Sequence, residues 1–112
     1  MASDLNNTLL QGRLTADPEF KATRNDNLVA KFRIASNHYV PSPQHTQENP
    51  DYRKFTTFIS VDAWNRLAAK CDELRKGDRV QIVGKLKQEN WIGENGEPRS
   101  RILISAETIN TL

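Results

Sequence analysis

Cysteine and histidine are scarce in this chain of 112 residues, and their scarcity excludes several kinds of site. The sequence has one cysteine, Cys71, and two histidines, His38 and His45. One thiol cannot close an intramolecular disulfide, and so few soft ligands do not reach the number and spacing of a zinc site. We therefore expect no bound metal, and a reducing compartment such as the cytosol or an organelle matrix.

Motifs for phosphate loops and for nucleophilic catalysis are also missing. The five glycines are spaced like neither a phosphate-binding loop nor a dinucleotide-binding motif. Serine, aspartate and histidine occur, but none lies on a recognisable nucleophile elbow. The carboxylates do not assemble into a cluster that would hold a catalytic metal. The sequence offers no catalytic residue and no cofactor site, and we expect a protein that is not an enzyme.

Long apolar runs and a secretory leader are absent from the sequence, so we expect no membrane partner. The formal net charge is only +2 at pH 7, which by itself does not favour a polyanionic partner. The distribution of the charges has to decide that point. At this length we expect a single domain over residues 1–112, with one hydrophobic core.

Apolar and polar residues alternate in five segments, which predicts five β-strands. The segments are residues 8–14, 28–39, 55–63, 80–87 and 99–106. In the last of them we expect Ile102, Ile104 and Ala106 to face inward and Leu103 to face outward. Gly12, inside the first segment, predicts a bend or a close approach of two backbones.

One helix is predicted between the third and fourth strands. The residues at helical spacing are Trp64, Leu67, Ala68, Cys71 and Leu74. Gly77 follows two cationic residues, which suits a helix end, so the helix should have about ten to twelve residues. Five strands with a helix in this place are the element order of a mainly β fold, the OB-fold, which is a five-stranded Greek-key barrel.

Turns are predicted where the alternation stops. Asp17–Pro18 and the segment 25–27 mark two of them, and residues 93–98 form a hairpin loop. Residues 41–51 contain three prolines and almost no apolar side chain. They predict a long, mobile hairpin loop, near residues 40–53.

Residues 55–64 have two different faces when they are read as a strand. The face that suits a core consists of Ile59, Val61 and Ala63. The opposite face consists of Phe58, Ser60, Asp62 and Trp64. Two large aromatic rings on a polar face are unusual, and every nucleic-acid base has a π-face that such rings can cover.

Tyr39 and Trp91 also project outward if the alternation is followed, so they join Phe58 and Trp64 as candidates for base stacking. Core packing remains an alternative for each of these rings. For Trp64 it is the stronger alternative, because this residue begins the helical stripe and could seal the helix against the barrel. We assign the other aromatics, Phe20, Phe32 and Phe55, mainly to packing in the core or an interface.

Cations dominate the outward positions of the predicted strands. They are Arg13, Lys31, Arg33, Arg79, Lys85, Lys87, Arg99 and Arg101, against Asp62 as the one clear outward anion. Most acidic residues lie in the N-terminal arm, the turns, the loops and the helix. The cations could simply keep strand edges from aggregating. Aromatic rings on the same faces favour binding of single-stranded nucleic acid instead, because cations follow a phosphate backbone while rings stack on its bases.

Several motifs together resemble the single-stranded DNA-binding protein family of bacteria and mitochondria, over nearly the whole chain. Residues 6–19, NNTLLQGRLTADPE, resemble that family's first strand and the turn after it. Residues 31–37, KFRIASN, resemble its second strand, and residues 63–68, AWNRLA, its junction of strand and helix. KGDRV at 76–80 with GKL at 84–86 resembles its fourth strand. Each motif is weak alone, but their order and spacing make a strong combined signal.

The resemblance implies specific roles for residues of this chain. The positions that match the family's base-stacking aromatics are Phe58, Trp64 and Trp91, and the fourth such position falls on Val40, so its role passes to the neighbouring Tyr39. The cations that the resemblance and the outward pattern together assign to phosphate contacts are Lys31, Arg33, Arg66, Lys76, Lys85, Lys87 and Arg101.

The resemblance also implies a homotetramer, and a cytoplasmic, nucleoid-associated bacterial protein rather than one of the mitochondrial matrix. Members of that family usually continue into a flexible tail with an acidic tip that recruits replication and repair enzymes. This sequence stops at Leu112. The sequence has no C-terminal tail, and two explanations stay open, a truncated sequence and a short member of the family. Recruitment of those enzymes through a tail is in doubt in either case.

Two functions remain open at this point. The first is sequence-tolerant binding and protection of single-stranded DNA in replication, recombination and repair. The alternative is an OB-fold interaction module of the replication or primosome machinery, which binds single-stranded DNA more weakly. Retention of Phe58, Trp64 and Trp91 favours the first.

Overall fold

The computed structural model describes all 112 residues. The strands are β1 (Thr8–Leu14), β2 (Glu19–Ala22), β3 (Leu28–Pro41), β4 (Tyr52–Trp64), β5 (Arg79–Ile92) and β6 (Pro98–Thr111). Helix α1 (Arg66–Lys70) lies between β4 and β5. The five predicted strands and the position of the helix are confirmed. Strand β2 was not predicted; it is only four residues long, and all four are exposed.

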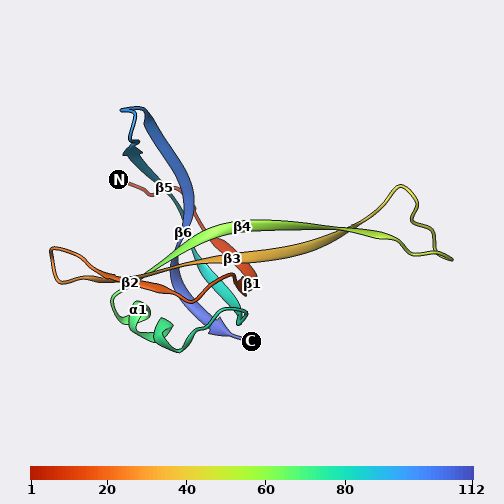
Figure 1. The fold of residues 1–112 in the computed structure, drawn as a ribbon, viewed down its shortest axis with the longest axis horizontal. Helices are drawn as coiled ribbons and strands as arrows, with labels where there is room; N and C mark the ends of the chain where they lie inside the picture. Colours follow the sequence, from red (N-terminus) through yellow and green to blue (C-terminus); the bar gives the residue numbers. More distant parts are fainter.

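A closed barrel is formed by β1, β5, β6, β4 and β3, in this order (Figure 1). Strand β1 closes it by pairing with β5 over most of its length and with β3 at its end, where Arg13 lies opposite Ala35. Strands β4 and β6 pair in parallel, and the other pairs are antiparallel. The short β2 extends the sheet beside β3. The architecture is the OB-fold barrel that the element order predicts.

The predicted close approach at Gly12 is confirmed. A Cβ atom at this position would lie 2.6 Å from the carbonyl oxygen of Ala35. Backbone atoms cannot move aside as a flexible side chain can, so only glycine lets β1 reach β3 here. The closure of the barrel therefore depends on Gly12.

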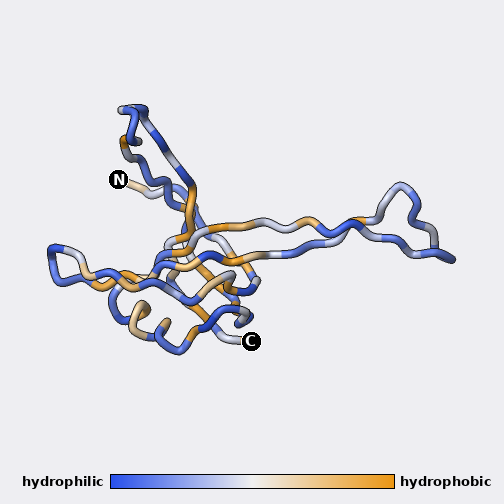
Figure 2. The backbone as a smooth tube through the Cα atoms, viewed as in Figure 1, coloured by the Kyte–Doolittle hydropathy of each residue, from blue (hydrophilic) through white to orange (hydrophobic).

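Hydrophobic residues are concentrated in the barrel and are sparse on the hairpins that leave it (Figure 2). The buried cluster contains Leu14, Ala30, Phe32, Ile34, Val61, Ala63, Ala68, Cys71, Leu74, Val80, Ile82 and Ile104. Burial raises the pKa of the Cys71 thiol to about 11, so this cysteine is a core residue in its neutral form.

The helix is shorter than predicted. Helix α1 has five residues, and a 3-10 turn, Cys71–Glu73, continues it. Trp64 still belongs to β4, and Asn65 then turns the chain with a positive φ of 53° while its backbone N–H donates to Leu28 at 2.7 Å. Leu74 is already extended. The predicted helix is therefore shortened at both ends: Trp64 belongs to the strand before it, and residues 71–74 form a 3-10 turn and the extended segment after it.

The β3–β4 hairpin forms a long arm beyond the barrel, which gives the molecule extents of 60 × 36 × 36 Å (Figure 1). Its strands stay paired out to Pro41 and Tyr52, so the loop is shorter than predicted and covers residues 42–51. The loop is tied internally: the Ser42 hydroxyl donates to the Asp51 carboxylate, and the Asp51 N–H donates to Nδ1 of His45 at 3.0 Å.

The expected orientation of β6 is only partly right. Ile104 is buried as predicted, but Ile102 is 52% exposed and Leu103 is fully buried. Pairing of β4 with β6 begins at Ser60 and Leu103, so strands flank Leu103 on both sides while Ile102 lies beyond the barrel wall. Ile102 lies on the same side of β6 as the buried Ile104, but there is no core beneath it at that point of the strand.

The only α-helix of the structure is too short to cross a membrane. No group of three or more histidine, cysteine, aspartate or glutamate side chains is placed to hold a metal ion.

Candidate nucleic-acid interface

One side of the barrel wall, formed by β3, β4, β6 and β5, collects most of the candidate residues. The register puts Lys31 opposite Asp62, Ala35 opposite Phe58, and Val29 opposite Trp64. It also puts Glu89 opposite Arg101 and Trp91 opposite Arg99. Residues paired in this way share a face of the sheet. We call this surface the outer sheet face; its members are Lys31, Arg33, Phe58, Ser60, Asp62, Trp64, Lys87, Glu89, Trp91, Arg99 and Arg101.

Phe58 lies near the middle of β4 and is 53% exposed. The guanidinium carbon of Arg33 lies 4.7 Å from the centroid of its ring. This is a cation–π contact, which holds a positive charge beside an open aromatic surface. The two side chains therefore place an exposed aromatic surface and a cation together, facing outward as the sequence alternation predicts for their strands.

Trp64 is the last residue of β4 and is half-buried. It lines a hollow together with Arg66 and Lys70 of α1 and with Ala106 and Glu107 of β6. The ring is thus neither in the core cluster nor fully open, and it has a cationic helix beside it.

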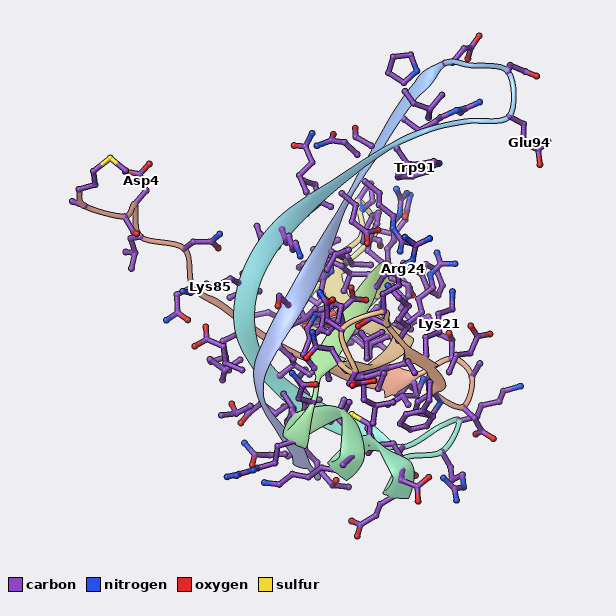
Figure 3. All side chains as sticks on the ribbon, turned by 90° about the vertical axis from the view of Figure 1, so that its left-hand side faces the viewer. Asp4, Lys21, Arg24, Lys85, Trp91 and Glu94 are labelled. Carbon is purple, nitrogen blue, oxygen red and sulfur yellow. The ribbon has the colours of Figure 1, made fainter.

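Trp91 lies near the tip of the β5–β6 hairpin, and 46% of its surface is exposed. In Figure 3 its side chain projects toward the side of the molecule where Lys21 and Arg24 of the β2–β3 hairpin lie. Core packing is therefore excluded for this ring. It overhangs the outer sheet face from a hairpin that rises above the barrel.

Tyr39 lies on the arm, opposite Lys54, and is largely exposed. It borders a hollow that also involves Arg13 and Arg79. Ala35, the partner of Phe58, lines the same hollow. Tyr39 thus extends the outer sheet face along the arm toward β1, away from Trp64 and Trp91.

Two of the predicted phosphate-binding cations already have carboxylate partners. Lys31 Nζ lies 3.2 Å from Asp62 and 3.9 Å from Glu89, and Arg101 donates from Nε to Glu89 at 2.7 Å. The hydrogen bond from Arg101 lowers the pKa of Glu89. Asp62 points outward as predicted, but Lys31 and the neighbouring strands leave it almost no exposed surface.

The remaining predicted cations form no ion pair, and they lie in different places. Arg33 and Lys87 lie on the outer sheet face. Lys85 lies opposite Ser105, which pairs in turn with Asp62, so it points from the same side of β5 as Lys87. It lies near the N-terminal arm, where Asn6 makes two hydrogen bonds with the backbone of Leu86 (Figure 3). Arg66 and Lys76 lie on α1 and in the turn before β5.

A hollow of about 340 Å³ lies on the outer sheet face between β2, β3, β4 and β6. Its lining mixes charges of both signs: Asp17, Glu19, Lys21, Lys31, Arg33, Asp62 and Arg101. Polar walls of this kind suit a hydrated, charged polymer rather than an apolar small molecule.

Comparison with known proteins decides the family. The model of the single-strand binding protein family matches residues 5–112 of this chain. The chain belongs to the single-strand binding protein family. The family resemblance expected from the sequence motifs is thereby confirmed.

Relatives of the family are found in several bacteria. The single-stranded DNA-binding protein of Thermus thermophilus is 35% identical over 102 residues, which are 91% of this chain and 35% of that protein. Single-stranded DNA-binding protein 2 of Chlorobaculum tepidum is 32% identical over 111 residues, 97% of this chain and 72% of that protein. The chain spans about a third of the length of the Thermus relative.

A solved structure of the family has the same fold. It is described as the Plasmodium falciparum SSB complex with ssDNA, and it matches with a TM-score of 0.84 over 100% of this chain and 98% of that chain. The sequences are 23% identical. The match therefore establishes the fold of this family member.

Two features of this family member were missed in the sequence. The first is Glu89, although alternation from Lys85 through Trp91 would have placed it on the outer sheet face. The second is the position of Phe55, which the sequence assigns to packing in the core or an interface; it is 46% exposed on the arm, so packing in the core is excluded. The sequence could have revealed this exposure, because the opposing segment, residues 36–41, is mostly polar and offers no core for the ring.

Proposed function

We propose that this chain binds single-stranded DNA with little sequence preference. Bases stack on Phe58, Trp64 and Trp91, with Tyr39 continuing the path along the arm. Phosphates are neutralised by the cations around these rings, which are Lys31, Arg33, Arg66, Lys76, Lys85, Lys87 and Arg101. Stacking tolerates any base, because every base has a π-face, and each stacked base contributes about 1 to 3 kcal/mol.

The contact between Arg33 and Phe58 is the observation that carries this proposal. A solvent-exposed phenylalanine costs hydrophobic free energy unless something covers it, and a cation held over the ring suits a ligand with flat bases and anionic links. The family membership and the names of the relatives, which are single-stranded DNA-binding proteins, support the same ligand.

We further propose that the protein works without catalysis, by covering DNA strands that replication, recombination and repair expose. Asp62 and Glu89, two of the carboxylates on or beside the outer sheet face, are both engaged by cations, and Asp17 accepts a hydrogen bond from the backbone N–H of Lys76. They are therefore poorly disposed to hold a catalytic metal. The bacterial relatives support a place in the bacterial cytoplasm, at the nucleoid.

A homotetramer is also part of the proposal. Family membership supports it, and so does the exposed Leu9, an apolar side chain on β1 that another copy would cover. In such an assembly, DNA would pass over several barrels.

A fluorescence titration tests the binding function. Adding oligo-dT should quench Trp64 and Trp91, and a duplex of equal length should quench them far less. The logarithm of the affinity should fall linearly with the logarithm of the salt concentration, with a slope of about −0.7 for each phosphate contacted. Absence of quenching at low salt would contradict the proposal.

A further inference from the structure

The arm of the β3–β4 hairpin has two solvent-facing sides, and only one of them belongs to the outer sheet face. Residues 36–41 pair with residues 52–57 beyond the barrel, where no other strand covers them (Figure 1). Tyr39 and Lys54 lie opposite each other on the first side. The other side carries two neighbouring pairs, His38 with Phe55 and Val40 with Arg53. We call these four residues the reverse face of the arm.

His38 and Phe55 form a stacked pair on the reverse face. Their ring centroids are 5.5 Å apart and their planes are inclined by 21°. A ring stacked on one side has its second π-face left for another partner, and Phe55 keeps 46% of its surface exposed. The pair is therefore the start of an aromatic stack that a further flat group can extend.

The charges of the arm favour an anionic partner. Residues 35–41 and 52–58 contain no aspartate or glutamate, but they contain Arg53 and Lys54. Arg53 forms no ion pair and lies on the same face as Phe55, two residues away, which is about 7 Å along a strand. The nearest acid in the chain, Asp51, is engaged by the Ser42 hydroxyl inside the loop.

We infer that the reverse face is a second binding site for single-stranded DNA, in which a base stacks on Phe55 and a neighbouring phosphate lies against Arg53. This inference rests on the proposed function. It adds that the arm contacts DNA on both sides, so that one segment of strand follows Tyr39 and Phe58 while another lies on His38 and Phe55. Charge complementarity selects this ligand over a second copy of the chain, whose arm is also cationic.

Oligonucleotides of two lengths test the inference. An oligo-dT of about 8 nucleotides fills one barrel face, whereas one about four times longer can also reach around the arm. Phe55→Ala should lower the affinity for the long oligonucleotide about tenfold and leave the affinity for the short one within twofold. Phe55→Tyr, which keeps an aromatic ring, should restore the long-oligonucleotide affinity.

Thr57→Ala is the matched control, because Thr57 lies on the same side of β4 as Phe55 and is exposed but not aromatic. Phe55 is outside the buried cluster, so the variants should keep the circular dichroism spectrum of the unmodified chain. Equal affinity of Phe55→Ala and the unmodified chain for the long oligonucleotide would overturn the inference and leave the proposed function intact. If the unmodified chain binds neither oligonucleotide, the proposed function itself fails.

Light scattering without DNA tests the alternative that a second copy of the chain, rather than DNA, occupies the reverse face. If Phe55→Ala lowers the mass of the assembly, the reverse face is a contact between copies of the chain, and the inference is overturned. We expect the mass to stay unchanged.

Discussion

Arg101 and Glu89 face each other across the β5–β6 hairpin, and Nε of Arg101 donates to Oε2 of Glu89 at 2.7 Å. Lys31 of β3 lies 3.9 Å from the same carboxylate. A negative charge therefore lies between two cations that we assign to phosphate contacts. In the proposed function, bound DNA competes with Glu89 for both of them.

Glu89→Gln should raise the affinity for oligo-dT about fivefold at low salt. The change removes a charge that repels phosphate at close range, an effect of about 1 kcal/mol near a protein surface. It also frees Arg101, so the salt dependence of binding should steepen by about 0.7, the contribution of one further phosphate. Titrations at several salt concentrations measure both quantities.

Glu97→Gln is the control for that prediction. Glu97 lies at the tip of the same hairpin, with Arg99 at 3.9 Å, and both side chains are largely exposed. Its replacement should change the affinity by less than twofold. A weaker affinity of Glu89→Gln would show instead that Glu89 positions Arg101 for binding.

The stability that Glu89 contributes should depend on pH. The hydrogen bond from Arg101 lowers the pKa of Glu89 in the folded chain below its ordinary value. A lowered folded-state pKa means that the contribution is present above the unfolded-state pKa and is lost as the pH falls through the folded-state pKa. We expect the difference in unfolding free energy between the unmodified chain and Glu89→Gln to decline in that acidic range. Urea unfolding at a series of pH values measures it, and a constant difference would contradict the prediction.

The sequence predicts those parts of the fold in which one strand face touches the core throughout. Strand β1 was predicted with its observed ends, because Leu10 and Leu14 keep the apolar side in register. On the hairpins the predicted strands stop short of the observed ends, since residues such as Arg53 and Lys54 pair without a core beneath them. An alternation of apolar and polar residues reveals a strand with one buried face, but it does not reveal strands that pair with both faces in solvent.

The candidate site also has a part that the sequence predicts and a part that it does not. The alternation of apolar and polar residues predicts that Phe58 and Trp91 point outward, because successive side chains of a strand point to opposite faces. It cannot state that Lys31 lies beside Glu89, because the two residues are on strands that meet only in the closed barrel. Which cations are free to bind phosphate is therefore a property of the register and not of any single segment.

Gly12→Ala should destabilise the fold by about 1 to 3 kcal/mol, the usual cost of forcing extra atoms into a packed site. The new methyl group would lie 2.6 Å from a backbone oxygen of β3, and β1 would have to move. Gly93→Ala is the control, since its Cβ would meet the flexible Arg99 side chain at 3.2 Å and the backbone oxygen of Glu97 only at an ordinary contact distance of 3.5 Å. Urea unfolding of both variants tests the difference, and equal stability would show that the barrel tolerates a wider gap.

Lys87→Ala and Lys85→Ala should have unequal effects on binding, although both lysines are exposed on β5. Both point from the same side of β5, but Lys87 lies two residues closer to Glu89 and Trp91, whereas Lys85 lies closer to the N-terminal arm (Figure 3). We expect Lys87→Ala to reduce the salt slope by about 0.7 and Lys85→Ala to reduce it less. Equal slopes for the two variants would show that DNA also reaches Lys85.

Replacing Phe58, Trp64 and Trp91 together by alanine distinguishes the proposed function from that of an interaction module of the replication machinery. A strand binder that depends on stacking loses about 1 to 3 kcal/mol for each ring, so the triple variant should show no measurable binding of oligo-dT. An interaction module relies less on these rings and would lose little. None of the three side chains belongs to the buried cluster, so the variant should remain folded.

The triple variant has no tryptophan left to report binding, so the binding is measured by the fluorescence anisotropy of a labelled oligonucleotide. Phe20→Ala is the control, because Phe20 is an exposed aromatic residue outside the outer sheet face. Retained affinity in the triple variant would favour the interaction module, since phosphate contacts alone would then account for the binding.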